Sequence, residues 1–198
     1  MNGNHPPQTA GYPAPFDEWG RITRFLESAR LAFARERSLW TSLEISDASG
    51  IEVSAPADQG YYRVALQRHL EAVGDTEVLF ASVLIHSYAL AEWAAANHLR
   101  RDARDMGGIE DWGGRLLAGT GMAWSRVAGG LPRAAETAVV RNLFAHGSPT
   151  VDATSASRLT AAGSKRFRAG TPRSLTYTDL RDYRACLRSL LRLGGVGR

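Results

Sequence analysis

Long runs of helical periodicity constrain the fold of this chain more than any other feature. Apolar residues recur every three or four positions over 16–43, 76–103 and 178–193, with polar and charged residues between them. No run alternates apolar and polar residues for long enough to demand a sheet. The sequence therefore predicts an all-α fold, an antiparallel helical bundle with an additional N-terminal helix.

Five helical segments are predicted, covering about 16–43, 59–74, 76–103, 132–146 and 178–193. Asp75 is the predicted N-cap of the third segment, and Pro132 suits the first turn of the fourth. Thr178 and Asp179 are expected to open the last one.

The stretches between these segments are predicted to be mostly irregular. Residues 44–59 form a loop, and 149–172 form a polar, basic connection. Residues 106–121 hold too many glycines for more than a short helical piece packed against the body. Tyr61 and Tyr62 leave the start of the second segment open between helix and extended chain.

The predicted organisation is one helical domain with additions at its ends. Residues 1–15, rich in Pro, Gly and Asn, are expected to be a disordered lead-in. Residues 16–58 are an N-terminal helical addition, 59–193 are the main helical domain, and 194–198 are a tail.

Composition argues against several classes of protein. Apolar residues make up 44% of the chain and charged residues 22%, which is ordinary for a soluble globular protein. No apolar run reaches the length that a membrane span needs, and residues 1–7 lack the features of a signal peptide. The single cysteine, Cys186, is predicted to be a small core or helix-flank residue of a cytoplasmic protein. Without a zinc-type cluster or a phosphate-binding glycine loop, neither a metal nor a cofactor is expected.

Positive charge is concentrated in the last third of the chain. The net charge is +4, but residues 141–198 hold eleven basic and three acidic side chains, whereas 1–140 hold 13 basic and 17 acidic. A one-sided positive field attracts a polyanion. General abundance of arginine is the plainer interpretation, although it does not explain why acidic residues become rare after position 140.

Three chemically suited residues lie close together at the end of the fourth predicted helix. Arg141, Asn142 and His146 provide a cation for a phosphate, an amide that can orient a substrate, and an imidazole that can transfer protons. Asn142 and His146 are four residues apart and so share a helix face. Gly147 and Pro149 end the helix, which places His146 in its last turn, where the helix dipole favours the protonated imidazole.

The pattern Arg-Asn-x-x-x-His, late in an all-helical chain, resembles the HEPN superfamily (higher eukaryotes and prokaryotes nucleotide-binding domains). The resemblance covers about residues 59–193. It implies a metal-independent endoribonuclease of a toxin–antitoxin or antiviral system, acting on tRNA, rRNA or mRNA. It also implies a homodimer in which two copies of the motif form one active site, and possible control by an antitoxin or another regulatory protein.

Glu92 is a further candidate, because it falls among the apolar positions predicted to face the core over 76–103. Those positions include Val78, Tyr88 and Trp93. A carboxylate facing the core needs a partner, and Arg141 is the predicted one. The family resemblance also implies an acidic residue at this place. The alternative is that Glu92 lies at the edge of the apolar face and reaches water.

Basic residues that follow the motif are candidates for contacts with RNA backbone. The predicted RNA-binding residues are Lys165, Arg166, Arg168, Arg181, Arg184 and Arg188. The last three, with Arg192, form a stripe along one helix, and a solvated face is the alternative interpretation of that stripe. An exposed Phe167 would be able to stack on a base.

Two other functions remain open besides RNA cleavage. A HEPN-like fold can serve as a non-catalytic module that pairs with a nucleotidyltransferase-type or other protein partner. The chain can also be a plain helical interaction protein in which the match to the motif is accidental.

If the chain cleaves RNA as the resemblance implies, Arg141, Asn142 and His146 predict attack by the RNA 2′-OH. The products would be 2′,3′-cyclic phosphate and 5′-hydroxyl ends.

Overall fold

The computed structural model describes residues 14–43, 50–58 and 60–197, and most of these lie in helices. The helices are α1 (Pro15–Ser42), α2 (Leu66–Gly74), α3 (Thr76–Leu99), α4 (Ile109–Gly119), α5 (Gly130–Ala145), α6 (Ala153–Ala161) and α7 (Tyr177–Leu193). Two strands, β1 (Glu52–Ala57) and β2 (Gly60–Ala65), are present as well, together with short 3₁₀ turns at 103–105 and 124–126. The predicted all-α fold class is confirmed.

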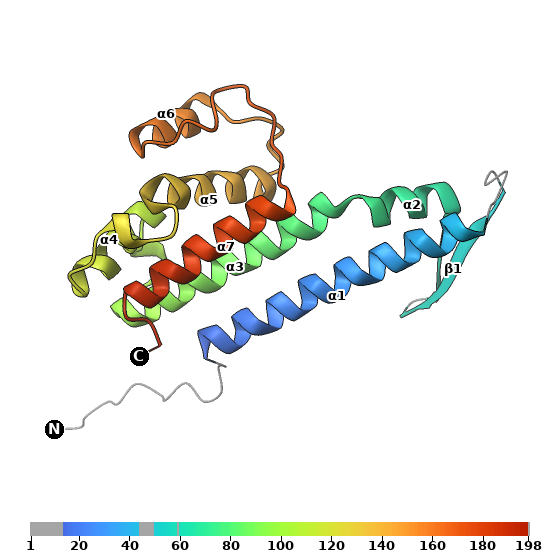
Figure 1. The fold of residues 1–198 in the computed structure, drawn as a ribbon, viewed down its shortest axis with the longest axis horizontal. Coiled ribbons are helices and arrows are strands. Elements are labelled where there is room, and N and C mark those ends of the chain that lie inside the picture. The colour runs from blue at the N-terminus through green and yellow to red at the C-terminus, as the bar shows by residue number, and fades with distance from the viewer. Residues whose placement is uncertain (1–13, 44–49, 59, 198) are drawn as a thin grey trace.

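The helix α3 lies at the centre of the fold and packs against α1, α4, α5 and α7 (Figure 1). The helices α5 and α7 also pack against each other, so that α3, α5 and α7 form a three-helix unit. The helix α4 closes one end of this unit, and α6 lies against α5. The helix α1 runs along α3 and extends past the body toward the hairpin of β1 and β2 (Figure 1).

The first half of α1 belongs to the core. Trp19, Ile22 and Leu26 are buried, and together they join both hydrophobic clusters of the core. Beyond Leu26 the helix contributes no buried residue.

The two predicted ends of the chain differ in the structure. Val196, in the predicted C-terminal tail, is buried. The predicted N-terminal lead-in falls almost entirely on residues 1–13, outside the described residues.

The main helices begin and end close to the predicted positions. Asp75 caps α3 as predicted, and its side chain accepts a hydrogen bond of 3.2 Å from the backbone N–H of Glu77. The helix ends at Leu99, four residues before the predicted end, because Arg100 adopts a left-handed conformation with φ 53°. The helix α7 begins one residue earlier than predicted, after a capping box formed by Thr176 and Asp179.

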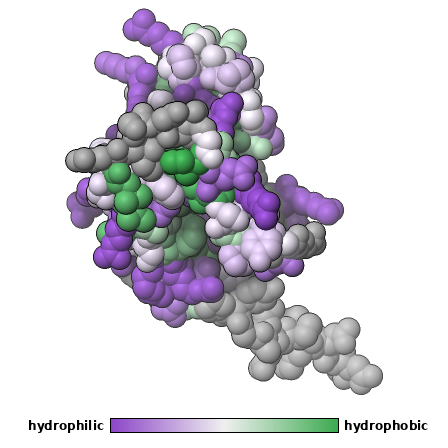
Figure 2. Space-filling model, turned by 90° about the vertical axis from the view of Figure 1, so that its right-hand side faces the viewer, coloured by the Kyte–Doolittle hydropathy of each residue, from purple (hydrophilic) through white to green (hydrophobic). Residues whose placement is uncertain are grey.

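A hairpin occupies a region predicted as loop and helix. The strands β1 and β2 pair antiparallel from Glu52 opposite Ala65 to Ala57 opposite Gly60, so Tyr61 and Tyr62 are extended and the predicted helix begins only at Leu66. Side chains of β2 are mostly exposed, and this end of the molecule is largely hydrophilic with a few apolar side chains (Figure 2). Because neither face of the strands is buried, they lack the alternation that signals a strand.

The predicted connection over 149–172 contains a helix, α6. Asp152 caps it by accepting a 2.7 Å hydrogen bond from the backbone N–H of Ser155, and Leu159 is its buried residue. The prediction was wrong here because α6 is short, rich in Ser and Thr, and anchored by a single large apolar side chain. The short helical piece predicted within 106–121 is confirmed as α4.

The buried face of α3 differs from the predicted one. Val78 and Trp93 are exposed, whereas Leu84, Ala91 and Ala95 are completely buried. Because α3 is apolar on most of its circumference, the spacing of its apolar residues did not determine which face is buried. By length and composition this helix is also apolar enough to cross a membrane, contrary to the sequence prediction, although 56% of its most apolar part is buried inside the protein.

The single cysteine lies in the core, as predicted. Cys186 on α7 is completely buried among the residues of one hydrophobic cluster. Burial raises the pKa of its thiol to about 12.

Two neighbouring glycines of α4 offer a test of the packing. A Cβ on Gly113 would lie 2.6 Å from a ring carbon of Trp124 and 3.0 Å from Leu190, whereas a Cβ on Gly114 meets nothing within 4 Å. We expect Gly114→Ala to stabilise the protein by about 0.5–1 kcal/mol through helix propensity. Gly113→Ala should destabilise it by about 1–3 kcal/mol through overpacking.

Urea unfolding followed by circular dichroism measures both variants, which differ by one position in the same helix. Equal stability of the two would show that α4 does not pack on the turn at 124–126 and on α7 as described.

Candidate functional site

The candidate motif lies where α5 ends. The last helical residue is Ala145, and His146 is the C-cap rather than a member of the last turn. Gly147 has φ +69°, and the backbone N–H of Ser148 donates to the carbonyl of Leu143 over 2.8 Å. The predicted helix stop at Gly147 is thus confirmed, and it leaves His146 at the negative end of the helix dipole.

Arg141 is the centre of a small polar cluster between α5 and α3. Its Nη1 donates a 2.9 Å hydrogen bond to Oδ1 of Asn142, and its Nη2 lies 3.7 Å from Oε2 of Glu92. The predicted pairing of Glu92 with Arg141 is confirmed. Side-chain exposures of 24% for Arg141 and 30% for Glu92 place the pair at the edge of the buried surface, so Glu92 also reaches water.

Tyr88 provides a platform for this cluster. The guanidinium of Arg141 lies over the Tyr88 ring, 4.2 Å from its centroid, and the ring meets Trp112 edge-on at 6.4 Å. Burial raises the pKa of Tyr88 to about 12, the charge of Glu92 adds to this effect, and the charge of Arg141 opposes it. The phenol is therefore neutral at physiological pH and acts as a fixed apolar and π surface beneath the cation.

A second ion pair was not predicted, and it is close enough to Tyr88 for the charge of Arg158 to oppose the rise in the pKa of Tyr88. Nε of Arg158 on α6 donates to Oε1 of Glu110 on α4 over 2.7 Å, and Nη2 of Arg158 bonds the other carboxylate oxygen. Burial favours a higher pKa for Glu110, but the hydrogen bonds from Arg158 outweigh it and hold the pKa below its usual range. These residues are 48 positions apart, so no sequence spacing links them.

His146 itself is exposed. Its imidazole forms no hydrogen bond or ion pair within the described part of the chain. A single chain therefore assembles Arg141, Asn142 and Glu92 into a contacting set, and neither ring nitrogen of the neighbouring His146 has a partner among the described residues. His146 remains next to Asn142, because its backbone N–H donates a 3.0 Å hydrogen bond to the Asn142 carbonyl, but it lies one residue past the end of α5.

The basic residues after α6 differ in their surroundings. Arg166 is engaged, because its Nη1 lies 2.6 Å from Oδ1 of Asp179 and 3.3 Å from the hydroxyl of Tyr183. Lys165 and Arg168 are exposed. Phe167 is buried, so the expectation that it is exposed for stacking on a base was wrong. Its burial follows from the core cluster that it joins with α5 and α7.

The predicted arginine stripe of α7 is only partly exposed. Arg181 and Arg188 face solvent, whereas Arg184 is buried against α1. Placement of α1 along this helix, which the sequence did not reveal, explains the difference.

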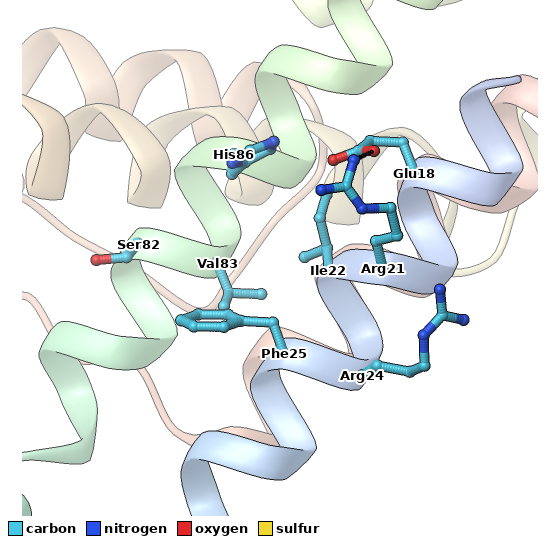
Figure 3. Close-up of a pocket in the computed structure, with 8 residues that line it drawn as sticks. All are labelled: Glu18, Arg21, Ile22, Arg24, Phe25, Ser82, Val83 and His86. Atoms are coloured by element: carbon cyan, nitrogen blue, oxygen red, sulfur yellow. Dashed lines mark hydrogen bonds and ion pairs between the residues drawn. The ribbon is translucent and has the colours of Figure 1, made fainter. Parts of the chain in front are cut away.

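Two large cavities lie away from the motif. One cavity, of about 550 Å³, lies between α1 and α3. In this cavity Phe25 points toward Val83, and His86 lies above them in the view of Figure 3. Another cavity, of about 680 Å³, lies between α1 and α7. Neither contains a residue of the motif.

Comparison with protein-family models, with curated proteins and with solved structures finds no match for the chain. Among the residues that the structure describes, no group of three or more His, Cys, Asp and Glu side chains is placed to hold a metal ion.

The Arg158–Glu110 pair predicts a pH-dependent stability. Glu110 has a lowered pKa in the folded protein, so its contribution is present above the unfolded value of 4.5 and is lost as pH falls through the folded value. We expect Glu110→Gln to cost about 1–2 kcal/mol at neutral pH. The gap between wild type and variant should shrink as the pH drops below 4.5.

Urea unfolding across this pH range measures the effect. Glu71→Gln is the matched control, because Glu71 pairs with Arg68 on the exposed surface of α2 over 3.0 Å and should contribute less than about 0.5 kcal/mol. A gap that stays constant with pH would contradict the proposed role of the pair.

Proposed function

We propose that this protein is a metal-independent endoribonuclease whose site is centred on Arg141, Asn142 and His146. The observation that carries the proposal is the contacting set of Arg141 with Asn142 and Glu92, next to an unpaired His146 at the helix end. The resemblance to HEPN domains supports the same residues. The substrate class is tRNA, rRNA or mRNA, in a toxin–antitoxin or antiviral setting in the cytoplasm.

The chemistry needs no group from outside the protein and the RNA. The 2′-oxygen attacks the neighbouring phosphorus, its proton passes to a base, and the bond to the 5′-oxygen breaks as that oxygen receives a proton. The products are a 2′,3′-cyclic phosphate and a 5′-hydroxyl. An imidazole serves as base or acid near neutral pH, and the planar guanidinium of Arg141 matches the phosphate oxygens as their charge grows.

Glu92 and Tyr88 are positioning residues in this proposal. The carboxylate and the ring hold Arg141 from two directions, so that little rotamer entropy is lost when the guanidinium meets a phosphate. Asn142 is bonded to Arg141 in the free protein, and its amide is placed to turn to the substrate when Arg141 does.

A homodimer would complete the site. One exposed imidazole cannot easily perform both proton transfers, and a twofold axis at the end of α5 would bring a second His146 to the other side of the scissile bond. Exposure of His146 without an intramolecular partner supports this arrangement.

A non-catalytic binding module is the second candidate function. It is favoured by one observation, that Arg141 is already satisfied by Asn142, Glu92 and Tyr88 within a single chain. In that case the motif stabilises the helix end, and a nucleotidyltransferase-type or other protein partner binds the domain.

Cleavage of total cellular RNA by purified protein in EDTA tests the proposal. We expect wild type to cut and His146→Ala to lose at least about a hundredfold in rate, because general acid–base catalysis contributes about that much or more. His86→Ala, which removes an exposed histidine of α3, should cut like wild type. End-group mapping should find 2′,3′-cyclic phosphate and 5′-hydroxyl ends.

Three results would decide against cleavage at the motif. They are a folded wild type without activity, equal cleavage by His146→Ala, and products with 3′-hydroxyl and 5′-phosphate ends. The first of these, combined with binding of a protein partner, would favour the non-catalytic module.

A further inference from the structure

A groove between α1 and α7 lies apart from the motif. It has a volume of about 680 Å³, and α1 and α7 form its two walls. Both helices pack against α3, which forms the body beneath them (Figure 1). None of Arg141, Asn142 and His146 lines it.

The groove is strongly cationic. Its basic lining residues are Arg126, Arg181, Arg184, Arg188 and Arg192. None of these five forms an ion pair with a carboxylate of the described residues.

The two acidic side chains of the groove are already engaged. Glu27 accepts a 2.6 Å hydrogen bond from the hydroxyl of Tyr177 and a 2.9 Å bond from Arg30. Asp182 lies 3.5 Å from Nη2 of Arg133. The arginines therefore exceed the available negative charge of the groove.

Arg184 makes this excess costly. Only 8% of the residue is exposed, and its Nη2 donates to the hydroxyl of Thr23 over 2.9 Å and to the carbonyl of Trp19 over 3.3 Å. Its buried Nε has no hydrogen-bond acceptor. Burial and the charge of Arg188 lower the pKa of Arg184 to about 10, so the guanidinium is still charged at neutral pH. The charge of Glu27 favours the cation from a distance, but no carboxylate is in ion-pair contact with Arg184. A buried cation without such a contact is unfavourable, and a bound anion would supply a closer counter-charge.

The length of the arginine row distinguishes a polyanion from a single phosphate. From Arg181 to Arg192 the helix rises about 16 Å at 1.5 Å per residue. This exceeds the reach of one phosphate group. Trp19, the aromatic residue that Arg184 covers at 5.1 Å, is 5% exposed and so offers no surface for stacking on a base.

We propose that the groove between α1 and α7 binds the phosphodiester backbone of a single nucleic-acid strand through this row of arginines. Recognition is by charge, without reading of bases, because the groove presents guanidinium groups and its aromatic residues are covered. Trp19 is buried, and the half-buried ring of Tyr177 lies under Arg30, 3.6 Å from its centroid. The inference does not rest on cleavage at the motif. The proposed surface holds a strand along the side of the body, and this binding does not depend on cleavage at the end of α5.

Fluorescence anisotropy with labelled oligo(dT) and oligo(U) tests the proposal with the full chain. DNA lacks the 2′-hydroxyl that the proposed cleavage requires, so oligo(dT) reports on binding alone. The double variant Arg188→Gln/Arg192→Gln removes two exposed charges of the groove. Arg184→Gln is a poorer probe, because Arg184 also holds α1 to α7.

We expect the double variant to bind oligo(dT) roughly tenfold more weakly than wild type at low salt. The slope of log affinity against log salt should become shallower by about 0.7 for each phosphate that the variant no longer neutralises. Arg35→Gln/Arg37→Gln, which removes two exposed charges from the second half of α1, should bind like wild type. The same pattern with oligo(U) shows that the shared backbone is recognised, whereas binding of oligo(U) without oligo(dT) would contradict recognition by backbone charge.

Equal binding by the double variant and wild type would overturn the proposal. So would an equal reduction in the control variant, which would mean that only overall charge matters, and so would failure of wild type to bind either probe. His146→Ala should bind oligo(dT) like wild type, so that a defect in cleavage and a defect in groove binding are separate results.

Discussion

The close packing of α3 against α1, α4, α5 and α7 determines how the helical body is arranged. Ala91, Ala94 and Ala95 are buried on α3, and such small side chains let other helices approach closely. The helices α5 and α7 contact α3 and each other, and α1 is laid along the outside. Because this packing fixes the rotation of α3, it also fixes the direction in which Tyr88 and Glu92 point. The polar cluster around Arg141 is thus a consequence of the core.

The helix α6 and the chain after it are held to the body by charged contacts as well as by the buried side chains of Leu159 and Phe167. The Arg158–Glu110 pair joins α6 to α4, and Arg166 joins the chain after α6 to the start of α7 through Asp179. These contacts connect different elements of the fold, and their strength depends on exposure and on pH.

The sequence predicted the long helices, the stop at Gly147 and the Glu92–Arg141 pair, because each depends on local spacing or on one strong rule of burial. It failed where the answer depended on packing between distant segments. The β1–β2 hairpin has no buried face to produce alternation, and α6 has one large buried side chain. The burial of Arg184 follows from the packing of α1 on α7. The spacing of apolar residues within either helix does not show that the two helices meet.

The position of the only thiol has a practical consequence. Cys186 is sealed in the core and its raised pKa suppresses the thiolate, so an alkylating reagent can react only with molecules that have opened. With no other cysteine in the chain, the rate of labelling reports on a single event, the exposure of α7. At high reagent concentration that rate equals the opening rate, and at low concentration it gives the population of open molecules. Labelling of Cys186 in the native sequence therefore reports how often the helical bundle opens.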